Sequence, residues 1–212
     1  MKSLFFVLIL FASAFADASS LSVKEKKQIF LNLLVPAVDE VYLELQNQYD
    51  EIKVMIDKDE NNPKINRLMK SYSAKDKQDL LVRIKPHPKS VAIAQAAMES
   101  GWATSRFTKV ANNIFGVWSF NKNEPRVPAS QKRGSKTIYI KKYSTISDSI
   151  RDYYKVLASG KAFKEFRKQK MISDNPYELV KRLDKYSEKG AEYGKELAAM
   201  IKYNKFYRID NK

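Results

Sequence analysis

An alanine-rich stretch bounded by a proline and a glycine constrains the fold of this chain more than any other segment. Residues 89–100 read KSVAIAQAAMES, with Pro88 before them and Gly101 after them. Proline suits the first turn of a helix, and glycine is the most frequent residue just beyond a helix end. Because small side chains let neighbouring elements approach closely, the pattern predicts a tightly packed central helix.

One carboxylate, Glu99, lies at the C-terminal end of this predicted helix. The partial negative charge of a helix C-terminus disfavours an ionised carboxylate there. Trp102 and the alanines would also desolvate the carboxyl group, and desolvation raises a carboxylate pKa. Both effects favour a proton that is held near neutral pH, as a general acid requires. The alternative is a solvated residue at the helix end.

Polar residues on either side of Glu99 extend the candidate site. Gln95 lies four residues before Glu99 on the same helix face, where it can orient the carboxyl group or a substrate amide. A surface polar residue is the alternative for Gln95. Asn112 and Asn113 follow a short amphipathic segment at 105–110. Asparagine favours left-handed turns, so a turn is the preferred interpretation for both residues. The alternative is that their side-chain amides donate hydrogen bonds to a substrate such as a sugar.

Two tryptophans offer flat apolar surfaces of the kind that sugar rings pack against. Trp102 directly follows Gly101, and Trp118 lies in the run IFGVWSF at 114–120. Some aromatic residues of this run must enter the core, because apolar side chains of this size bury most of their surface. Trp118 is the candidate for the substrate groove.

Helical periodicity covers most of the remaining chain and predicts a mainly α (α+β) fold with a small β element. The predicted helices cover 23–57, 64–72, 74–84, 147–157, 162–170, 176–184 and 191–203. Pro36 should break or kink the first of them, and Ser73 is the expected N-cap of the third. Residues 137–143 (TIYIKKY) predict a strand that pairs with 114–120 as a hairpin, and 121–134 predicts an exposed loop.

The charge of the chain indicates an acidic partner. There are 39 Lys and Arg residues against 24 Asp and Glu, a net charge of +15. An anionic cell-wall polymer or lipid headgroups fit this charge. Nucleic acid is not expected, because the basic residues are spread out and no nucleic-acid-binding motif is present. The segment 161–170 (KAFKEFRKQK) could rest on an anionic membrane surface, but a solvated helix face balanced by Glu165 is the preferred interpretation.

Two residue types that often carry catalysis or bind metals are scarce. The chain has no cysteine, and its one histidine, His87, lies between two prolines. This scarcity argues against a zinc site and against Ser-His or Cys-His nucleophilic catalysis, so no metal or cofactor is expected. Elimination leaves carboxylates as the candidate catalytic groups.

The N-terminal residues 1–18 have the pattern of a secretory signal peptide. Lys2 precedes an apolar run at 4–11, and small residues suited to cleavage occur at 14–18. The apolar run is too short to span a bilayer as a helix, and an uncleaved anchor is the alternative. Wall-binding repeats and a sorting signal are not found in the sequence, so an exported, periplasmic protein is expected.

The segment AIAQAAMESGWATSRF followed by ANNIFGVW resembles the Bax-like branch of the bacterial peptidoglycan glucosaminidases, relatives of the FlgJ and autolysin enzymes in glycoside hydrolase family 73. KKYSTISDSIRDYYKVL and LDKYSEKGAEYGKELAAMIKYNKFYRID extend the resemblance, which covers residues 86–210. It implies a lysozyme-like domain at 86–212, preceded by a helical extension at 19–85. It also implies cleavage of the β-1,4 bond after N-acetylglucosamine in peptidoglycan glycan strands.

The resemblance also implies roles for individual residues. Glu99 matches the catalytic acid, and Tyr186 matches a tyrosine close to the reacting sugar. Phe115 and Gly116 match the apolar floor and the turn after the asparagine pair. The implied enzyme is an endo-β-N-acetylglucosaminidase; a lytic transglycosylase or muramidase of related fold, and a non-catalytic wall-binding scaffold, are the alternatives.

One departure from the family pattern concerns the second carboxylate. Many relatives supply it from the β region, but here the interval 117–143 contains one acid, Glu124, in a basic loop. Asp148 and Asp152 are expected at a helix start and on its exposed face. The second role in catalysis therefore falls either to Glu124 or to the acetamido group of the substrate, as in substrate-assisted glycosidases.

Overall fold

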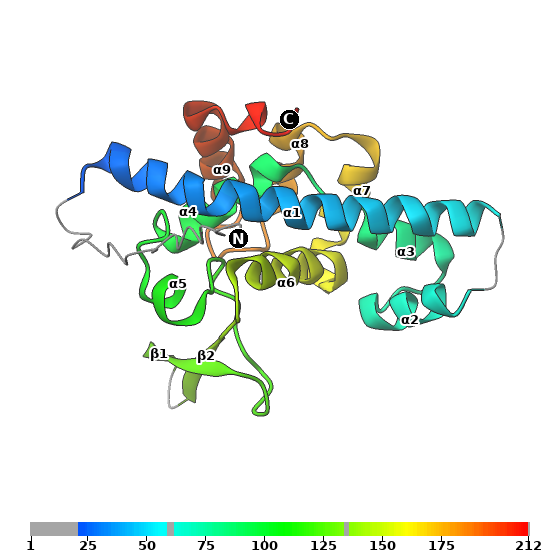
Figure 1. The fold of residues 1–212 in the computed structure, drawn as a ribbon, viewed down its shortest axis with the longest axis horizontal. Helices are drawn as coiled ribbons and strands as arrows, with labels where there is room; N and C mark the ends of the chain where they lie inside the picture. The colour runs from blue at the N-terminus through cyan, green and yellow to red at the C-terminus, as the bar shows by residue number, and fades with distance from the viewer. Residues whose placement is uncertain (1–20, 59–61, 134–135, 212) are drawn as a thin grey trace, which may run out of the picture.

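A long helix, α1 (Val23–Asp57), crosses the molecule in this computed structural model, and other helices pack along it (Figure 1). The structure describes residues 21–58, 62–133 and 136–211, so the predicted signal at 1–18 lies outside the described residues. Ser22 and Glu25 form a capping box at the start of α1, which matches the predicted helix. The predicted break at Pro36 is wrong: the helix continues through Pro36, whose exposed position lets water solvate the carbonyl that proline leaves unpaired.

Two short helices follow α1. The first, α2 (Pro63–Tyr72), begins at Asn62, whose Oδ1 accepts a hydrogen bond from the Lys64 amide at 2.8 Å. The expected N-cap role of Ser73 is wrong, because Ser73 takes a left-handed conformation (φ 52°) and ends α2 instead. The second helix, α3 (Lys77–Ile84), starts three residues later than predicted, where the carboxylate of Asp76 caps it.

The predicted central helix is confirmed as α4 (Lys89–Ser100). Its residues 91–97 are all buried. Three consecutive residues after it, Gly101, Trp102 and Ala103, have φ values of 57°, 62° and 61°. A left-handed conformation is costly for tryptophan and alanine, so this turn depends on its surroundings. The hydroxyl of Ser100 helps to hold it by accepting a hydrogen bond from the Ala103 amide at 2.8 Å.

The remaining predicted helices are present with small shifts at their ends. They are α6 (Ile146–Ser159), η1 (Lys161–Phe163) leading into α7 (Lys164–Ile172), α8 (Pro176–Leu179) leading into η2 (Val180–Arg182), and α9 (Ala191–Asn204). Two short elements were not predicted as helices: α5 (Arg106–Ala111), in the amphipathic segment, and η3 (Phe206–Arg208). A capping box between Thr145 and Asp148 starts α6, which confirms the helix-start role of Asp148.

The small β element is a two-stranded antiparallel sheet that projects from the helical body (Figure 1). It pairs β1 (Arg126–Arg133) with β2 (Lys136–Lys141). The predicted loop at 121–134 is therefore partly a strand, and a register irregularity between Pro128 and Lys132 explains why its sequence lacks clean alternation. The predicted hairpin with 114–120 is reduced to one bridge, between Trp118 and Ile140.

Buried apolar side chains form two clusters that share α1. The larger one joins α1 to α4, α6 and α9, with fully buried residues such as Phe30, Leu34, Ile93, Ile150 and Leu197. The smaller one lies between the far end of α1 and the pair α2 and α3. The mainly α fold with a small β element is confirmed. The domain boundary at 85/86 stays a prediction, although α1 and α4 bury side chains in the same cluster.

Candidate active site

Glu99 lies in the last turn of α4 and is bound by a tyrosine from α9. The hydroxyl of Tyr193 donates a hydrogen bond to Glu99 Oε1 at 2.7 Å. Glu99 is at the surface, yet the protein around it desolvates the carboxyl group and raises its pKa. The Tyr193 hydrogen bond and the charge of Lys189 oppose this rise, because each favours the carboxylate. The predicted rise of the Glu99 pKa is confirmed, with desolvation as its main cause.

A chain of hydrogen bonds leads from Tyr193 into the core. Gln95 Nε2 donates to the Tyr193 hydroxyl at 3.0 Å, and the Tyr153 hydroxyl donates to Gln95 Oε1 at 2.6 Å. Tyr193, Gln95 and Tyr153 are all buried. Complete burial keeps Gln95 away from solvent, so of its two predicted roles the structure fits the orientation of the carboxyl group. Gln95 does this through Tyr193 and not by touching Glu99 itself.

His87 ends this chain on the inner side. Its Nε2 lies 3.0 Å from the Tyr153 hydroxyl, which already donates its proton to Gln95, so Nε2 must carry the proton and donate. Burial, with the nearby charge of Lys170, holds the pKa of His87 well below its usual value, and the ring is neutral. The ring of His87 also stacks on Tyr154, with centroids 4.3 Å apart. In each hydrogen bond of the chain from His87 to Glu99, the donor is therefore the group nearer to His87 and the acceptor is the group nearer to Glu99.

Tyr186 stacks on Tyr193, beside the candidate acid. The two rings are nearly parallel, with a 9° interplanar angle and 5.5 Å between centroids. Burial and the charge of Glu99 raise the pKa of Tyr186, so its phenol stays neutral. The sequence indicated Tyr186 and missed Tyr193, which is the tyrosine that binds the carboxyl group. The spacing of seven residues in KYSEKGAEY does not show which tyrosine reaches Glu99, because an irregular turn separates them.

The two asparagines hold the turn that follows α5. Asn112 is left-handed (φ 48°), and its Nδ2 donates to the carbonyls of Tyr143 and Ser144 at 3.1 and 3.0 Å. The buried Asn113 donates from Nδ2 to two carbonyls, one of them that of Lys141 in β2. The preferred turn interpretation is confirmed. The side-chain amides of Asn112 and Asn113 join this turn to β2 and to the residues just before α6.

The other residues of this turn divide between core and surface. Phe115 is buried and stacks on Tyr153 with 3.9 Å between centroids, so it packs against one member of the hydrogen-bonded chain. Gly116 has φ 67° and makes the turn that the sequence predicts. Trp118 is 40% exposed and lies near the highly exposed Phe120, at 6.2 Å between centroids. An exposed aromatic pair of this kind can pack against sugar rings.

Trp102 faces the N-terminal helix. Its ring meets Phe30 edge-on, with centroids 5.2 Å apart, and Lys27 Nζ lies over the ring at 4.6 Å. Lys27 also donates to Asn204 Oδ1 of α9 at 2.8 Å. Trp102 therefore joins the turn after Glu99 to α1 directly and to α9 through Lys27, whereas its expected part in desolvating Glu99 stays a prediction.

A second group of acidic side chains lies where β2 meets α6. Glu124 accepts a hydrogen bond from Ser119 Oγ at 2.7 Å, and Lys141 lies 3.9 Å from its carboxylate. Asp152 pairs with Lys141 at 2.9 Å and accepts from the Tyr143 hydroxyl at 2.7 Å. The expected exposed position of Asp152 is therefore wrong, because these two partners hold it against β2.

Tyr143 connects this second group to the first. Burial and the hydrogen bond to Asp152 raise the pKa of Tyr143, and the charges of Glu124 and Tyr186 add to the rise. Tyr186 in turn responds to the charge of Glu99. The charge of Glu124 thus acts on Tyr143, and the charge of Glu99 acts on Tyr186. Among the residues that the structure describes, no group of three or more His, Cys, Asp or Glu side chains could hold a metal ion.

The basic segment 161–170 forms the solvated face that was preferred from sequence on one side, where Lys161, Lys164 and Lys168 are exposed and Lys168 pairs with Glu165 at 3.0 Å. Its other side packs into the protein. Phe163, Phe166, Arg167 and Lys170 are all buried. Burial and neighbouring positive charges lower the pKa of Lys170 to about 7. Its Nζ donates to the carbonyls of Arg83 and Lys85, so the segment packs against α3. None of the helices in the described part of the chain is long and apolar enough to cross a membrane.

Comparison with known proteins places this chain in a family. The glucosaminidase family, described as mannosyl-glycoprotein endo-β-N-acetylglucosaminidase, matches residues 74–206. The chain is similar to protein Bax of Escherichia coli (strain K12), with 30% identity over 131 residues. This alignment covers 59% of the chain and 46% of Bax, so the chain spans about half the length of this curated relative.

Solved structures share the fold. The catalytic domain of the autolysin Auto from Listeria monocytogenes has a TM-score of 0.57 at 19% identity, over 99% of this chain and 100% of that domain. The glycoside hydrolase domain of FlgJ from Salmonella typhimurium has a TM-score of 0.53 at 16% identity, over 86% of this chain and 90% of that domain. These likenesses confirm the predicted lysozyme-like fold. The matched family model spans more than half of the chain, and the chain therefore belongs to the glucosaminidase family of glycoside hydrolases.

Proposed function

We propose that this protein is an exported peptidoglycan hydrolase that cleaves the β-1,4 bond after N-acetylglucosamine, with Glu99 as its general acid. The observation that carries the proposal is the position of Glu99: a carboxyl group with a raised pKa, at the surface, whose Oε1 is bound by a buried tyrosine. Membership of the glucosaminidase family supports the class of bond. The net charge of +15 suits a polymer that bears carboxylates, and the signal pattern at 1–18 supports export to it.

The geometry suggests how Glu99 would deliver its proton. Because Tyr193 donates to Oε1, the proton of the neutral acid belongs on Oε2. Transfer of that proton to the glycosidic oxygen would leave a carboxylate that still accepts the Tyr193 hydrogen bond. That bond favours the ionised form, so it becomes stronger as the proton leaves. Gln95, Tyr153 and His87 hold Tyr193 in place and do not themselves exchange protons with substrate.

The second catalytic role has two candidates. Glu124 is fixed by Ser119 and by Lys141, so its loop position does not deprive it of a defined geometry. The acetamido group of the substrate is the other candidate, and it would need no second carboxylate from the protein. Glu124→Gln is therefore the matched comparison for Glu99→Gln.

Replacing Tyr193 with Phe should shift the pH profile of activity. The Tyr193 hydrogen bond lowers the pKa of Glu99, so its removal should raise that pKa further. The active form is the protonated acid, whose activity is lost as pH rises through the pKa. The alkaline limb of kcat/KM should therefore move to higher pH, while kcat falls about fivefold to tenfold because one orienting hydrogen bond is lost.

The control for this shift is Tyr207→Phe, which removes a hydroxyl from an exposed tyrosine of η3. Its pH profile should match that of the unmodified protein. An alkaline limb that stays in place or moves to lower pH in Tyr193→Phe would show that Tyr193 does not control the ionisation of the catalytic acid.

The function itself is tested by product analysis. Purified peptidoglycan is digested with the protein, the products are reduced with borohydride, and mass spectrometry identifies the reduced sugar. Products reduced at N-acetylglucosamine that disappear with Glu99→Gln would support the proposal. Reduced N-acetylmuramic acid or anhydro ends would instead show a muramidase or a lytic transglycosylase. Binding to peptidoglycan with no products from either protein would show a wall-binding scaffold.

A further inference from the structure

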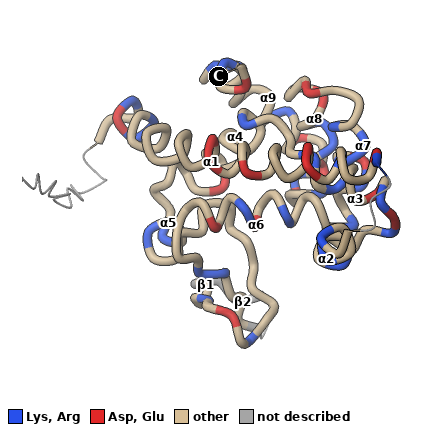
Figure 2. The backbone as a smooth tube through the Cα atoms, turned by 45° about the vertical axis from the view of Figure 1, so that its right-hand side comes forward, with Lys and Arg blue, Asp and Glu red and all other residues tan. Residues whose placement is uncertain are grey.

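A strongly basic pocket of about 600 Å³ lies between α3, the end of α6 and the start of α7. Lys and Arg residues gather where these elements meet (Figure 2). Six of the residues that line the pocket are cations: Lys75, Arg83, Lys161, Lys164, Arg167 and Lys168. The one acid in its wall is Asp79. Glu99 and its hydrogen-bonded partners are not part of this lining, so the pocket is separate from the candidate active site.

Two buried arginines form the inner wall. Arg83 and Arg167 are 9% and 4% exposed. Arg83 binds Asp79 at 2.8 Å and donates from Nη1 to the carbonyls of Tyr72, Ala158 and Ser159 at the ends of α2 and α6. Arg167 donates from Nη1 to the carbonyls of Leu157 and Gly160 at 3.0 and 2.7 Å. Asp79, the one acid of the pocket wall, thus pairs with Arg83, while Arg167 donates to carbonyls, which leaves buried positive charge in excess.

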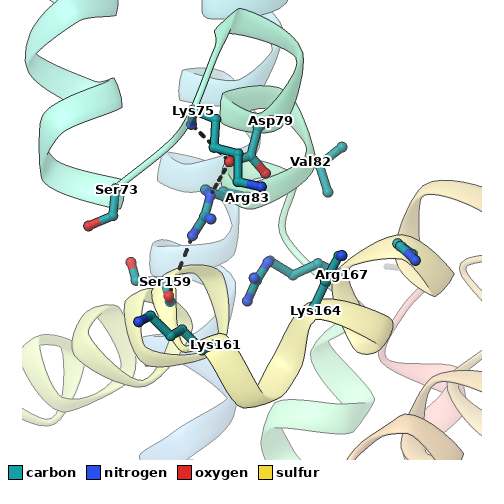
Figure 3. Close-up of a pocket in the computed structure, with 10 residues that line it drawn as sticks. Ser73, Lys75, Asp79, Val82, Arg83, Ser159, Lys161, Lys164 and Arg167 are labelled. Atoms are coloured by element: carbon teal, nitrogen blue, oxygen red, sulfur yellow. Dashed lines mark hydrogen bonds and ion pairs between the residues drawn. The ribbon is translucent and has the colours of Figure 1, made fainter.

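Within the described residues, the hydrogen bonds of these two arginines do not use all of their guanidinium donors. Those of Arg167 use Nη1 alone, and Arg83 uses Nη1 and Nε. The hydroxyl of Ser159 is buried and has no hydrogen-bond partner within the described residues. In Figure 3 Ser159 lies between Arg83 and Lys161, and the end of the Arg167 side chain points toward it. A buried hydroxyl without a partner beside an excess of cations is the environment that an anion would satisfy.

The outer wall supplies flexible cations. Lys161 and Lys164 are exposed, and neither forms an ion pair within the described residues. Lys168 is partly neutralised, because it pairs with Glu165 at 3.0 Å. Arginine forks bind phosphate or carboxylate in two-point contacts, whereas lysines act as point charges around them. The combination recognises a ligand with more than one negative charge.

We propose that this pocket binds a phosphate-bearing ligand, with Arg83 and Arg167 at its base, Lys161 and Lys164 over it, and Ser159 donating to one oxygen. A phosphomonoester or pyrophosphate brings two or more charges in one compact group. This suits six cations, of which Arg83 pairs with Asp79 and Lys168 with Glu165, better than a single carboxylate does. The volume of the pocket is in the range of small-molecule sites, so it accommodates more than an isolated phosphate ion. The inference does not depend on the proposed hydrolase function.

Binding of inorganic pyrophosphate to the full chain, measured by isothermal titration calorimetry at low ionic strength, tests the proposal. The double variant Lys161→Gln with Lys164→Gln should weaken binding about tenfold or more, since two charge-assisted contacts are lost. Both lysines are exposed, so the variant should fold. The matched control is Lys24→Gln with Lys202→Gln, two exposed lysines of α1 and α9, and it should bind as the unmodified protein does.

Ser159→Ala separates a ligand site from a merely structural cluster. It removes a buried hydroxyl that has no partner, so the midpoint of thermal unfolding should stay unchanged or rise. Pyrophosphate binding should nevertheless weaken severalfold, because the ligand loses one donor. Absence of pyrophosphate binding, or equal weakening by the two lysine pairs, would overturn the proposal.

Vesicle flotation distinguishes two sources of the phosphate. Vesicles of phosphatidylcholine containing phosphatidic acid are compared with vesicles of phosphatidylcholine alone. Flotation that requires phosphatidic acid, and is lost in the Lys161 and Lys164 variant but kept in the control pair, would assign the site to a lipid headgroup. Binding of pyrophosphate without flotation would assign it to a soluble phosphate compound. Either result agrees with a phosphate-binding pocket.

Discussion

Replacing Glu99 with Gln should lower kcat for peptidoglycan digestion by about a thousandfold, within the range that general acid catalysis contributes. Glutamine keeps the shape of the side chain, and its amide oxygen can still accept the hydrogen bond from Tyr193. It cannot supply a proton to the leaving oxygen. KM should therefore change little, and the loss should appear in kcat. Initial rates of release of reducing ends, with and without the substitution, measure the effect.

The stability of Glu99→Gln is its internal control. The pKa of Glu99 is higher in the folded protein than in the unfolded chain, so folding binds protons and the contribution of Glu99 to stability falls as pH rises through that range. Glutamine does not ionise. The unfolding midpoint at neutral pH should thus be unchanged or higher. Full activity of the variant would refute the acid role.

Glu124→Gln is the comparison that assigns the second role. A loss of similar size to that of Glu99→Gln would make Glu124 the second carboxylate of an inverting pair. Activity close to that of the unmodified protein would instead favour the acetamido group of the substrate. The comparison is matched in shape, because Ser119 Oγ can still donate to the amide oxygen of a glutamine in the same place.

Replacing Phe30 with Ala should destabilise the protein by about 3–5 kcal/mol, the usual loss for a phenylalanine in a core. The Phe30 side chain is completely buried in the cluster that contains α4. It also meets the ring of Trp102 edge-on. Trp102 sits in a left-handed turn that is costly for it, so the loss of this contact should loosen the turn that follows Glu99. Urea unfolding measures the change in free energy.

The matched control is Ile29→Ala, the preceding residue of α1, whose side chain is 53% exposed. Its effect should stay within about 0.5 kcal/mol, as for most surface substitutions. Where Phe30→Ala still folds, its activity should fall more than that of Ile29→Ala under the same conditions. Equal stability of the two variants would show that α1 does not support the site.

Helical periodicity predicted most of the helices, and end signals such as Pro88 with Gly101 located the central one. Caps that the structure adds are Ser22 with Glu25, Asn62 and Thr145, each of which acts over three or four residues. The position of Glu99 at a helix end followed from the Pro88 and Gly101 signals, and the direction of its pKa shift followed from the expected desolvation. Fold class and family resemblance could therefore be predicted without coordinates.

The β element was less predictable. The strand β1 contains Pro128 and no run of alternating apolar residues, so its sequence reads as a loop. It pairs only because β2 presents an edge beside it. The same limit applied to one side of 161–170, because charge predicted the solvated face with Glu165 but not the burial of two cations on the opposite side. Arg167 and Lys170 are buried there because carbonyls at the ends of α3 and α6 need donors.

The sequence by itself determined the helices, the central acid and its turn, since caps, alanines and glycine act on their immediate neighbours. The tertiary structure alone decided which groups surround that acid. Tyr193 reaches Glu99 from 94 residues away, Tyr153 reaches Gln95 from 58, and Phe30 reaches Trp102 from another helix. Such contacts depend on how helices pack against one another, and packing is a property of the assembled core that no short stretch of sequence contains.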